Sequence, residues 1–364
     1  MIYKQFNDLS LSALGLGCMR LPLNSQDETD INEASAAEMV RYAMENGINY
    51  FDTAWRYHGG ESELVMGRIL SAYPRDSFYL ASKFPGFSLE TIENPAAVFE
   101  EQLQKCKVEH FDFYLFHNVC ERNIDWLLDP KYGVADYLIA QKKAGRIRYL
   151  GFSTHGSRAV IQRFLDAYGE ELSFCQIQLN YLDWDLQSAK EKVELLNRHK
   201  IPIWVMEPVR GGRLVQLPES AAQKLDSLRP DVNGPEWAFR FLQSIEGVTM
   251  ILSGMSNMEQ LQENIATFAD NKPLNDIEMA AIMDVAADMI RANKVPCTGC
   301  SYCTEHCRQE LLISELIKAY NEGVKPEGKG PQLCIGCRKC ESVCPQGIKI
   351  SEVMRTFAAK QQKG

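Results

Sequence analysis

Residues 48–63 read INYFDTAWRYHGGESE, a run of β-branched and aromatic residues that ends in Asp and Thr. From residue 13 onward, eight such strand-like runs alternate with longer amphipathic stretches. The other seven runs begin near Leu14, Phe78, Phe111, Arg148, Phe174, Ile201 and Val248. Each interval leaves room for a crossover helix, so the pattern predicts parallel strands joined by helices. Eight strand–helix units predict an α/β fold closed into a (β/α)8 TIM barrel.

An open, doubly wound sheet is the alternative arrangement of strands and helices in alternation. Such a sheet usually carries a glycine-rich GxGxxG turn between its first strand and first helix. The first run here, residues 14–19, reads LGLGCM and lacks that turn. The sequence therefore favours a closed barrel.

Cysteine usage divides the chain. Of the twelve cysteines, Cys18, Cys106, Cys120 and Cys175 are scattered, and the other eight lie between residues 297 and 344. We therefore expect a barrel over residues 1–285 and a small helical domain over residues 286–364. A helix over residues 274–293 is predicted to lead from one to the other. Four of its residues at four-residue intervals are expected to face inward, namely Ile277, Ala281, Val285 and Met289.

Two cysteine runs share the spacing CxxCxxCxxxC, and Pro345 follows the second. They are Cys297, Cys300, Cys303 and Cys307, and then Cys334, Cys337, Cys340 and Cys344. In this spacing three thiolates bind one 4Fe-4S cluster and the fourth binds the other cluster. Zinc usually takes two separated CxxC pairs, and disulfides are not expected in a cytosolic chain. By the iron-sulfur rule for this spacing, one cluster is held by Cys297, Cys300, Cys303 and Cys344. The other is held by Cys334, Cys337, Cys340 and Cys307. Residues 290–355 resemble bacterial-type ferredoxins, in particular the helical form with a longer insert.

Ionisable side chains stand at the ends of three consecutive predicted strands. Asp52 and Tyr57 follow the second strand, Lys83 closes the third and His117 closes the fourth. Taken singly, an Asp can cap a loop, a Lys can be a solvated charge and a His can be a hydrogen-bonded core residue. Together they meet at the rim where (β/α)8 enzymes perform chemistry.

Reduction of a carbonyl group would use all four side chains. The carbonyl oxygen must gain a proton as its carbon accepts a hydride. A tyrosine, with an ordinary pKa of about 10, donates that proton more readily beside a cation, which Lys83 would supply. Asp52 would neutralise the buried Lys83, and His117 would orient the substrate by a hydrogen bond.

This arrangement, together with the GESE run after Tyr57, resembles the aldo-keto reductases over residues 10–270. The resemblance implies that Tyr57 is the proton donor and that Lys83, Asp52 and His117 complete a tetrad. It also implies a nicotinamide cofactor. Ser153, Thr154 and Gln176 would hold the nicotinamide amide, although the family often has Asn where Thr154 stands.

Further positions are implied for the rest of that cofactor. Met206 stands where many relatives stack an aromatic residue on the nicotinamide. The eighth-strand segment, with Ser253, Gly254, Gln260 and Asn264, aligns with the loop and helix start that hold the adenosine phosphate end. NADPH-preferring relatives often place cations where Gly254 and Gln260 stand. The sequence therefore does not decide whether the cofactor is NADP or NAD.

Charge and composition exclude some partners. The net charge is -9 and the pI is about 5.4, which disfavours nucleic acid and anionic lipid. Residues 1–10 lack a basic region followed by an apolar stretch, and no window is apolar enough to cross a membrane. We expect a cytoplasmic protein.

Three functions follow from the two halves. The first is an oxidoreductase that reduces a carbonyl or quinone-like small molecule and exchanges electrons with a ferredoxin or flavoprotein partner through its clusters. A hydride carries two electrons and a cluster takes one at a time, so direct exchange between them is awkward. The second is an electron-transfer or adaptor protein with a weakly catalytic barrel. The third is a reductase whose clusters are only structural.

Overall fold

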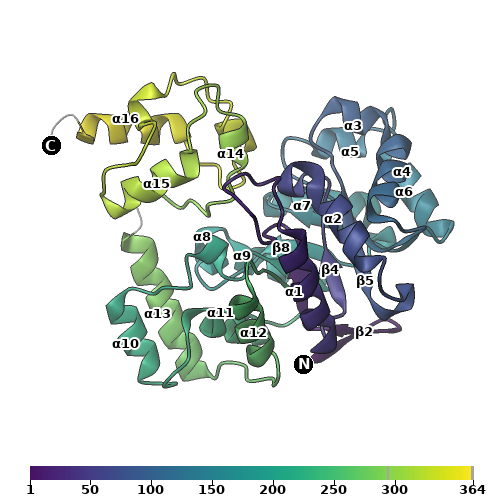
Figure 1. Cartoon of the computed structure of the whole chain (residues 1–364), viewed down its shortest axis with the longest axis horizontal. Helices are drawn as coiled ribbons and strands as arrows, with labels where there is room; N and C mark the ends of the chain where they lie inside the picture. Colours follow the sequence, from purple (N-terminus) through teal and green to yellow (C-terminus); the bar gives the residue numbers. More distant parts are fainter. Residues whose placement is uncertain (293–294, 362–364) are drawn as a thin grey trace.

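Eight parallel strands form a closed barrel in the computed structural model, which describes residues 1–292 and 295–361 (Figure 1). Around the barrel the strands follow the order β10, β3, β4, β5, β6, β7, β8, β9, and β9 pairs with β10 to close it. Their bounds are β3 Leu14–Gly17, β4 Tyr50–Asp52, β5 Tyr79–Phe84, β6 Phe111–Phe116, β7 Ile147–Thr154, β8 Cys175–Gln178, β9 Ile203–Met206 and β10 Val248–Gly254. The predicted (β/α)8 barrel is confirmed, and each of the eight predicted runs overlaps one of these strands.

Helices cover the outside of the barrel. Those of the barrel part are α1 Glu33–Glu45, α2 Glu61–Leu70, α3 Leu89–Glu93, α4 Pro95–Cys106, α5 Ile124–Leu128, α6 Val134–Lys143, α7 Arg158–Tyr168, α8 Asp183–Leu186, α9 Ala189–Arg198, α10 Glu219–Asp226, α11 Gly234–Gln243, α12 Met258–Thr267 and α13 Asp276–Ala292. Several begin at a side-chain cap, as where Asn257 accepts a hydrogen bond from the Gln260 amide at the start of α12. No helix in the described part of the chain is long and apolar enough to span a membrane.

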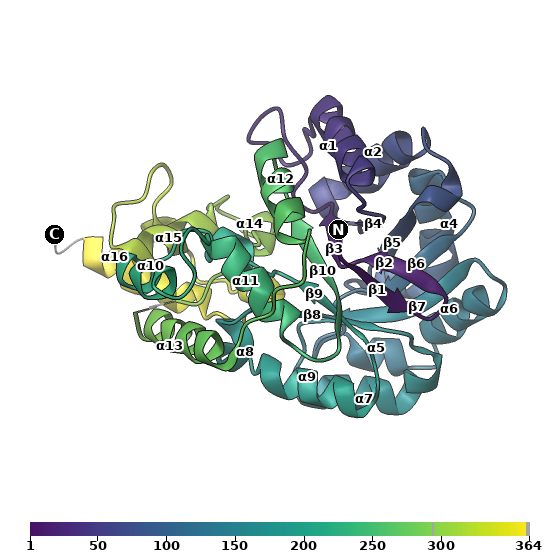
Figure 2. The same ribbon diagram turned by 90° about the horizontal axis from the view of Figure 1, so that it is seen from below.

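An N-terminal hairpin that we did not predict closes one end of the barrel. Strands β1, Tyr3–Phe6, and β2, Leu9–Ser12, pair antiparallel across a turn in which Asn7 has a positive φ of 51°. Phe6 enters the barrel interior, where its ring centroid lies 4.9 Å from that of Trp204. Figure 2 shows the hairpin lying across this end. The end that remains open to ligands is therefore the opposite one, at the carboxyl ends of the strands.

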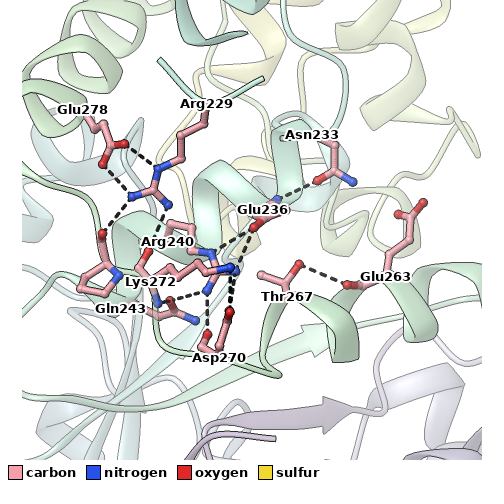
Figure 3. A network of polar contacts seen from close by, with 11 residues as sticks. Arg229, Asn233, Glu236, Arg240, Gln243, Glu263, Thr267, Asp270, Lys272 and Glu278 are labelled. Atoms are coloured by element: carbon pink, nitrogen blue, oxygen red, sulfur yellow. Dashed lines mark hydrogen bonds and ion pairs between the residues drawn. The ribbon is translucent and has the colours of Figure 1, made fainter. Parts of the chain in front are cut away.

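Helix α13 leads out of the barrel and is tied to it by ion pairs. Glu278 binds the Arg229 guanidinium with N–O distances of 2.5 and 2.7 Å, and beside it Arg240 binds Glu236 and Asp270 (Figure 3). Ala281, Val285 and Met289 are buried as predicted, but Ile277 is 70% exposed. The prediction that Ile277 faces inward is wrong because the buried face of α13 begins at the neighbouring Glu278, about 100° around the helix from Ile277.

The boundary between the two parts stays a prediction. A division between residues 285 and 286 would fall inside α13, and the predicted helix end at residue 293 lies outside the described residues.

The C-terminal part is a small helical module beside the barrel (Figures 1 and 2). Its helices are α14 Tyr302–Glu305, α15 Ile313–Glu322 and α16 Ile350–Gln361. Ile313, Leu316 and Ile317 of α15 are buried in a core separate from that of the barrel. Several of the cysteines belong to or pack against the same core.

Candidate active site

The four predicted catalytic residues line one cavity of about 630 Å³ at the carboxyl end of the barrel. Asp52 is the last residue of β4, and Lys83 lies in β5, which pairs with it. His117 directly follows β6. Tyr57 begins a short helical turn after β4 that continues through Gly60. Strand order therefore brings together residues up to 65 positions apart in the chain.

The loop that carries Tyr57 is held by its own backbone geometry and by a histidine. Gly59 and Gly60 have φ values of 61° and 103°, which suit glycine. The His58 ring accepts a hydrogen bond from the Leu21 amide at 3.1 Å and contacts the Glu28 carbonyl at 2.7 Å, so that Nδ1 is its donor. These contacts fix the direction in which the Tyr57 side chain leaves the loop.

Lys83 lies at the centre of a short chain of polar contacts. Its ammonium is buried and donates to Asp52 Oδ1 at 2.5 Å, to the Thr53 carbonyl at 2.8 Å and to the Tyr57 hydroxyl at 3.2 Å. A buried charge is tolerated where it is paired and its donors are satisfied. The three contacts use the three donors of the ammonium, so Lys83 has one defined position.

The pKa of Tyr57 is shifted in the direction opposite to the one we expected. Burial raises the pKa of Tyr57, and the negative charge of Asp52 acts in the same direction. We expected the Lys83 cation to make Tyr57 more acidic, but the pKa of Tyr57 is shifted upward. Burial raises the pKa of Asp52, while Lys83 opposes that shift. Tyr57 therefore keeps its proton at neutral pH.

His117 is a neutral imidazole. Burial lowers its pKa well below the usual value, and Lys83 adds to the shift. Its ring centroid lies 4.9 Å from that of Phe87 and 6.0 Å from that of Tyr57. Its Nδ1 atom is buried and has no hydrogen-bond partner in the part of the chain that the structure describes.

Seven of the eight predicted cofactor-binding residues line the same cavity, namely Ser153, Gln176, Met206, Ser253, Gly254, Gln260 and Asn264. Thr154 is the exception. Its hydroxyl donates to the Val119 carbonyl at 2.6 Å and accepts from the Gly156 amide, so it braces the loop after β7. His155, which we did not single out, lines the cavity instead. Buried Gln176 Oε1 has no partner among the described residues.

Glu207 is a cavity residue that the sequence did not reveal. It follows Met206 with a positive φ of 55°, and its carbonyl accepts a hydrogen bond from the Asn180 amide group. Burial raises the pKa of Glu207 to about 7, and the charge of Asp183 adds to the shift. No spacing in the sequence marks this carboxylate, because the groups that act on it, such as Asp183, Arg20 and Thr298, lie far from it in the chain.

The C-terminal module forms part of the cavity wall, which we did not foresee. It contributes Cys300, Tyr302, Glu305, His306, Ser342 and Val343. The two parts meet closely at Gly211, where an added Cβ would lie 1.9 Å from the Thr298 carbonyl oxygen. Gln346 binds Gln178 and Gln187 through two hydrogen bonds of 2.9 Å. The barrel and the module therefore share one site.

The first predicted cysteine set surrounds a second, small cavity. Cys297, Cys300 and Cys303 line it together with Cys344, the last cysteine of the other run. No three His, Cys, Asp or Glu side chains among the described residues form a group suited to a single metal ion. Four thiols around a closed, mostly apolar space fit an iron-sulfur cluster, because each thiolate binds a different iron. Cys300 lines both cavities.

The second predicted set is less enclosed. Cys340 is buried, Cys307 and Cys334 are half-buried and Cys337 is exposed. Burial raises the pKa of Cys340, and the charges of Glu341 and Cys334 act in the same direction.

Comparison with known families separates the same two parts. The model of the aldo/keto reductase family matches residues 13–287, and the model of a 4Fe-4S dicluster domain matches residues 296–348. The oxidoreductase YqkF of Bacillus subtilis is 25% identical over 79% of this chain and 97% of its own length. The NADH-specific methylglyoxal reductase of Escherichia coli is 23% identical over 78% of this chain and 97% of its own.

Solved structures agree with the fold. The holo form of the aldo-keto reductase AKR11C1 from Bacillus halodurans superimposes with a TM-score of 0.63 at 26% identity, covering 78% of this chain and 96% of that one. The thermostable aldo-keto reductase Tm1743 has a TM-score of 0.64 at 19% identity, covering 78% of this chain and all of that one, and supports the fold alone. The chain therefore belongs to the aldo/keto reductase family and carries a 4Fe-4S dicluster domain after its barrel.

Proposed function

We propose that the barrel reduces a carbonyl or quinone-like small molecule with NADPH or NADH, and that Tyr57 donates the proton. The observation that carries this proposal is the contact of buried Lys83 with both Asp52 and Tyr57 beside His117 in one cavity. Two relatives support a carbonyl substrate through their names. One is the methylglyoxal reductase of E. coli, and the other is a 6-dehydroglucose reductase of Novosphingobium aromaticivorans that is 28% identical over 59% of this chain.

The side chains divide the chemistry between them. The nicotinamide, when bound, supplies a hydride to the carbonyl carbon. Tyr57, protonated at neutral pH, gives its proton to the carbonyl oxygen, and Lys83 stabilises the phenolate that remains. Neutral His117 donates a hydrogen bond that orients that oxygen. Gln176 and Ser153 would hold the carboxamide group, because both line the cavity and Gln176 Oε1 lacks a partner among the described residues.

The C-terminal domain would hold two 4Fe-4S clusters with the predicted cysteine sets. The cavity enclosed by Cys297, Cys300, Cys303 and Cys344 supports the crossed arrangement. Because Cys300 also lines the active-site cavity and Cys337 is exposed, electron exchange with a ferredoxin or flavoprotein partner is part of the proposal. This placement is compatible both with clusters that transfer electrons and with clusters that only support the fold. The two roles are distinguished by testing whether NADPH or NADH reduces the clusters.

Replacement of Tyr57 by Phe tests the proton donor. Tyr57→Phe keeps the ring and removes the hydroxyl, so NAD(P)H-dependent carbonyl reduction should fall by about a hundredfold or more. Iron, sulfide and the cluster absorbance should stay at the wild-type level. Tyr168→Phe, on α7 outside the cavity, is the matched control. Wild-type turnover in Tyr57→Phe would refute the assignment.

A second candidate is an electron-transfer or adaptor protein with a weakly catalytic barrel. Three positions favour it, since Thr154 is engaged elsewhere, Gly254 has no side chain and Gln260 accepts from the Ser256 amide. Anaerobic calorimetric titration with NADPH and NADH separates the candidates. If neither nucleotide binds, the adaptor is favoured.

A further inference from the structure

Arg20 occupies the edge of the active-site cavity where Gly254 leaves space. It follows β3 and is exposed, and its side chain lines the cavity. A Cβ placed on Gly254 would lie 3.2 Å from Arg20 Cβ and 3.3 Å from its Cγ and Cδ. The absence of a side chain at residue 254 therefore makes room for the stem of Arg20.

The guanidinium of Arg20 reaches toward the loop after β9. A Cβ placed on Gly211 would lie 3.6 Å from Arg20 Nη2. Arg20 thus bridges the end of β10 and the loop that follows β9. Its charge also acts on Glu207, whose pKa it lowers against the larger effect of burial.

The guanidinium of Arg20 has no direct partner among the described residues. Across residues 1–292 and 295–361, no hydrogen bond or ion pair joins the Arg20 side chain to another residue. The neighbouring polar groups are committed, since Gln260 accepts from the Ser256 amide and Asn264 donates to Ser253 Oγ at 3.1 Å. Lys83 is bound to Asp52 deep in the cavity. An unpaired guanidinium on a cavity rim is suited to an anion with several oxygens, because it can donate two parallel hydrogen bonds.

We propose that Arg20 binds phosphate oxygens of the nicotinamide dinucleotide and replaces the cation that Gly254 and Gln260 do not provide. This inference rests on the proposed function, because it needs a dinucleotide in the cavity. Two phosphate groups could be its partner, the 2'-phosphate of NADPH or the diphosphate that NADPH and NADH share.

Anaerobic calorimetry on the full holoprotein tests the proposal. NADPH and NADH are titrated into the wild type, Arg20→Gln and Arg20→Lys. Arg198→Gln is the matched control, because Arg198 ends α9 and does not line the cavity. Arg20→Gln should weaken binding by about ten- to a hundredfold, as expected for loss of a charge-assisted hydrogen bond. Arg20→Lys should recover part of the affinity, and Arg198→Gln should bind as the wild type does.

The pattern of loss identifies the phosphate. A loss confined to NADPH assigns the 2'-phosphate, and an equal loss for both nucleotides assigns the diphosphate. Unchanged Kd values for both nucleotides in Arg20→Gln overturn the inference and leave the proposed function standing. A wild type that binds neither nucleotide overturns the proposed function, and the role of Arg20 with it.

Discussion

At the scale of single residues, the contacts of Lys83 explain how a charge is kept inside a barrel. Lys83 and Asp52 have side-chain exposures of 1% and 3%, and each would be costly to bury alone. Asp52 Oδ1, the Thr53 carbonyl and the Tyr57 hydroxyl satisfy the three donors of the Lys83 ammonium, whereas the buried Asp52 Oδ2 has no partner among the described residues. Tyr57, the proposed proton donor, is thereby positioned by a pair in which loss of either partner alone would leave a buried, unpaired charge and cost stability as well as activity.

The pH dependence of carbonyl reduction follows from the same contacts. A proton donor must carry its proton, and burial raises the pKa of Tyr57 above the ordinary value of about 10. The kcat for reduction should therefore stay level from neutral pH to about pH 9 as far as Tyr57 is concerned. Because the pKa of Tyr57 is raised, the loss of activity at alkaline pH should occur at higher pH than for an ordinary tyrosine. Steady-state assays at saturating cofactor check this profile.

Glu207 provides the control for that profile. It lines the same cavity, and its pKa of about 7 lies inside the tested range. Glu207→Gln removes this titration. A fall in kcat near pH 7 that persists in Glu207→Gln would contradict a protonated Tyr57 as the donor.

At the scale of elements, α2 and α4 pack closely because residue 67 is a glycine. A Cβ on Gly67 would lie 2.2 Å from the Lys105 carbonyl oxygen and 2.9 Å from Cys106 Cα, which are backbone atoms that cannot rotate away. Gly67→Ala should force the helices apart and destabilise the fold by about 1–3 kcal/mol. Thermal unfolding followed by circular dichroism should show a lower midpoint.

Gly169→Ala is the comparison for that substitution. Gly169 follows α7 with a φ of −54°, and its added Cβ would meet Leu165 at an ordinary 3.8 Å. Its unfolding midpoint should stay within a few degrees of the wild type. If Gly67→Ala is equally harmless, the close packing of α2 on α4 does not limit stability.

At the scale of the whole molecule, the small C-terminal core is expected to depend on the two clusters that we propose it holds. Among the described residues, twelve buried ones make up that core, and two of them are cysteines, Cys303 and Cys340. Removal of iron and sulfide should loosen this domain while the barrel keeps its fold, because metal binding supplies much of the folding free energy of such small domains. Limited proteolysis should then cut within residues 297–361 first.

Catalysis should respond to that loosening. Tyr302, Glu305 and His306 line the active-site cavity, so the KM of the carbonyl substrate should rise in the cluster-free protein. The far-ultraviolet signal of the barrel helices should persist as the control. Resistance of the C-terminal domain to protease after cluster removal would contradict this dependence.

The sequence by itself determined the repeating strand–helix units, the two cysteine runs and the ionisable residues at three strand ends. These signals are local, since a strand period, a ligand spacing and a motif each depend on neighbours within a few residues. It did not reveal the N-terminal hairpin, whose short strands carry little periodicity, or the exposure of Ile277.

Only the tertiary structure decided which surfaces meet. The burial of Glu207, the place of Tyr302 beside Tyr57 and the position of Arg20 over Gly254 each join segments that lie far apart in the chain. The first two depend on how the C-terminal domain packs against the barrel, and the third on the pairing of β10 with β3. Packing depends on the shape and volume of all the side chains at the contact. No local pattern encodes that shape, so the shared site became visible only in three dimensions.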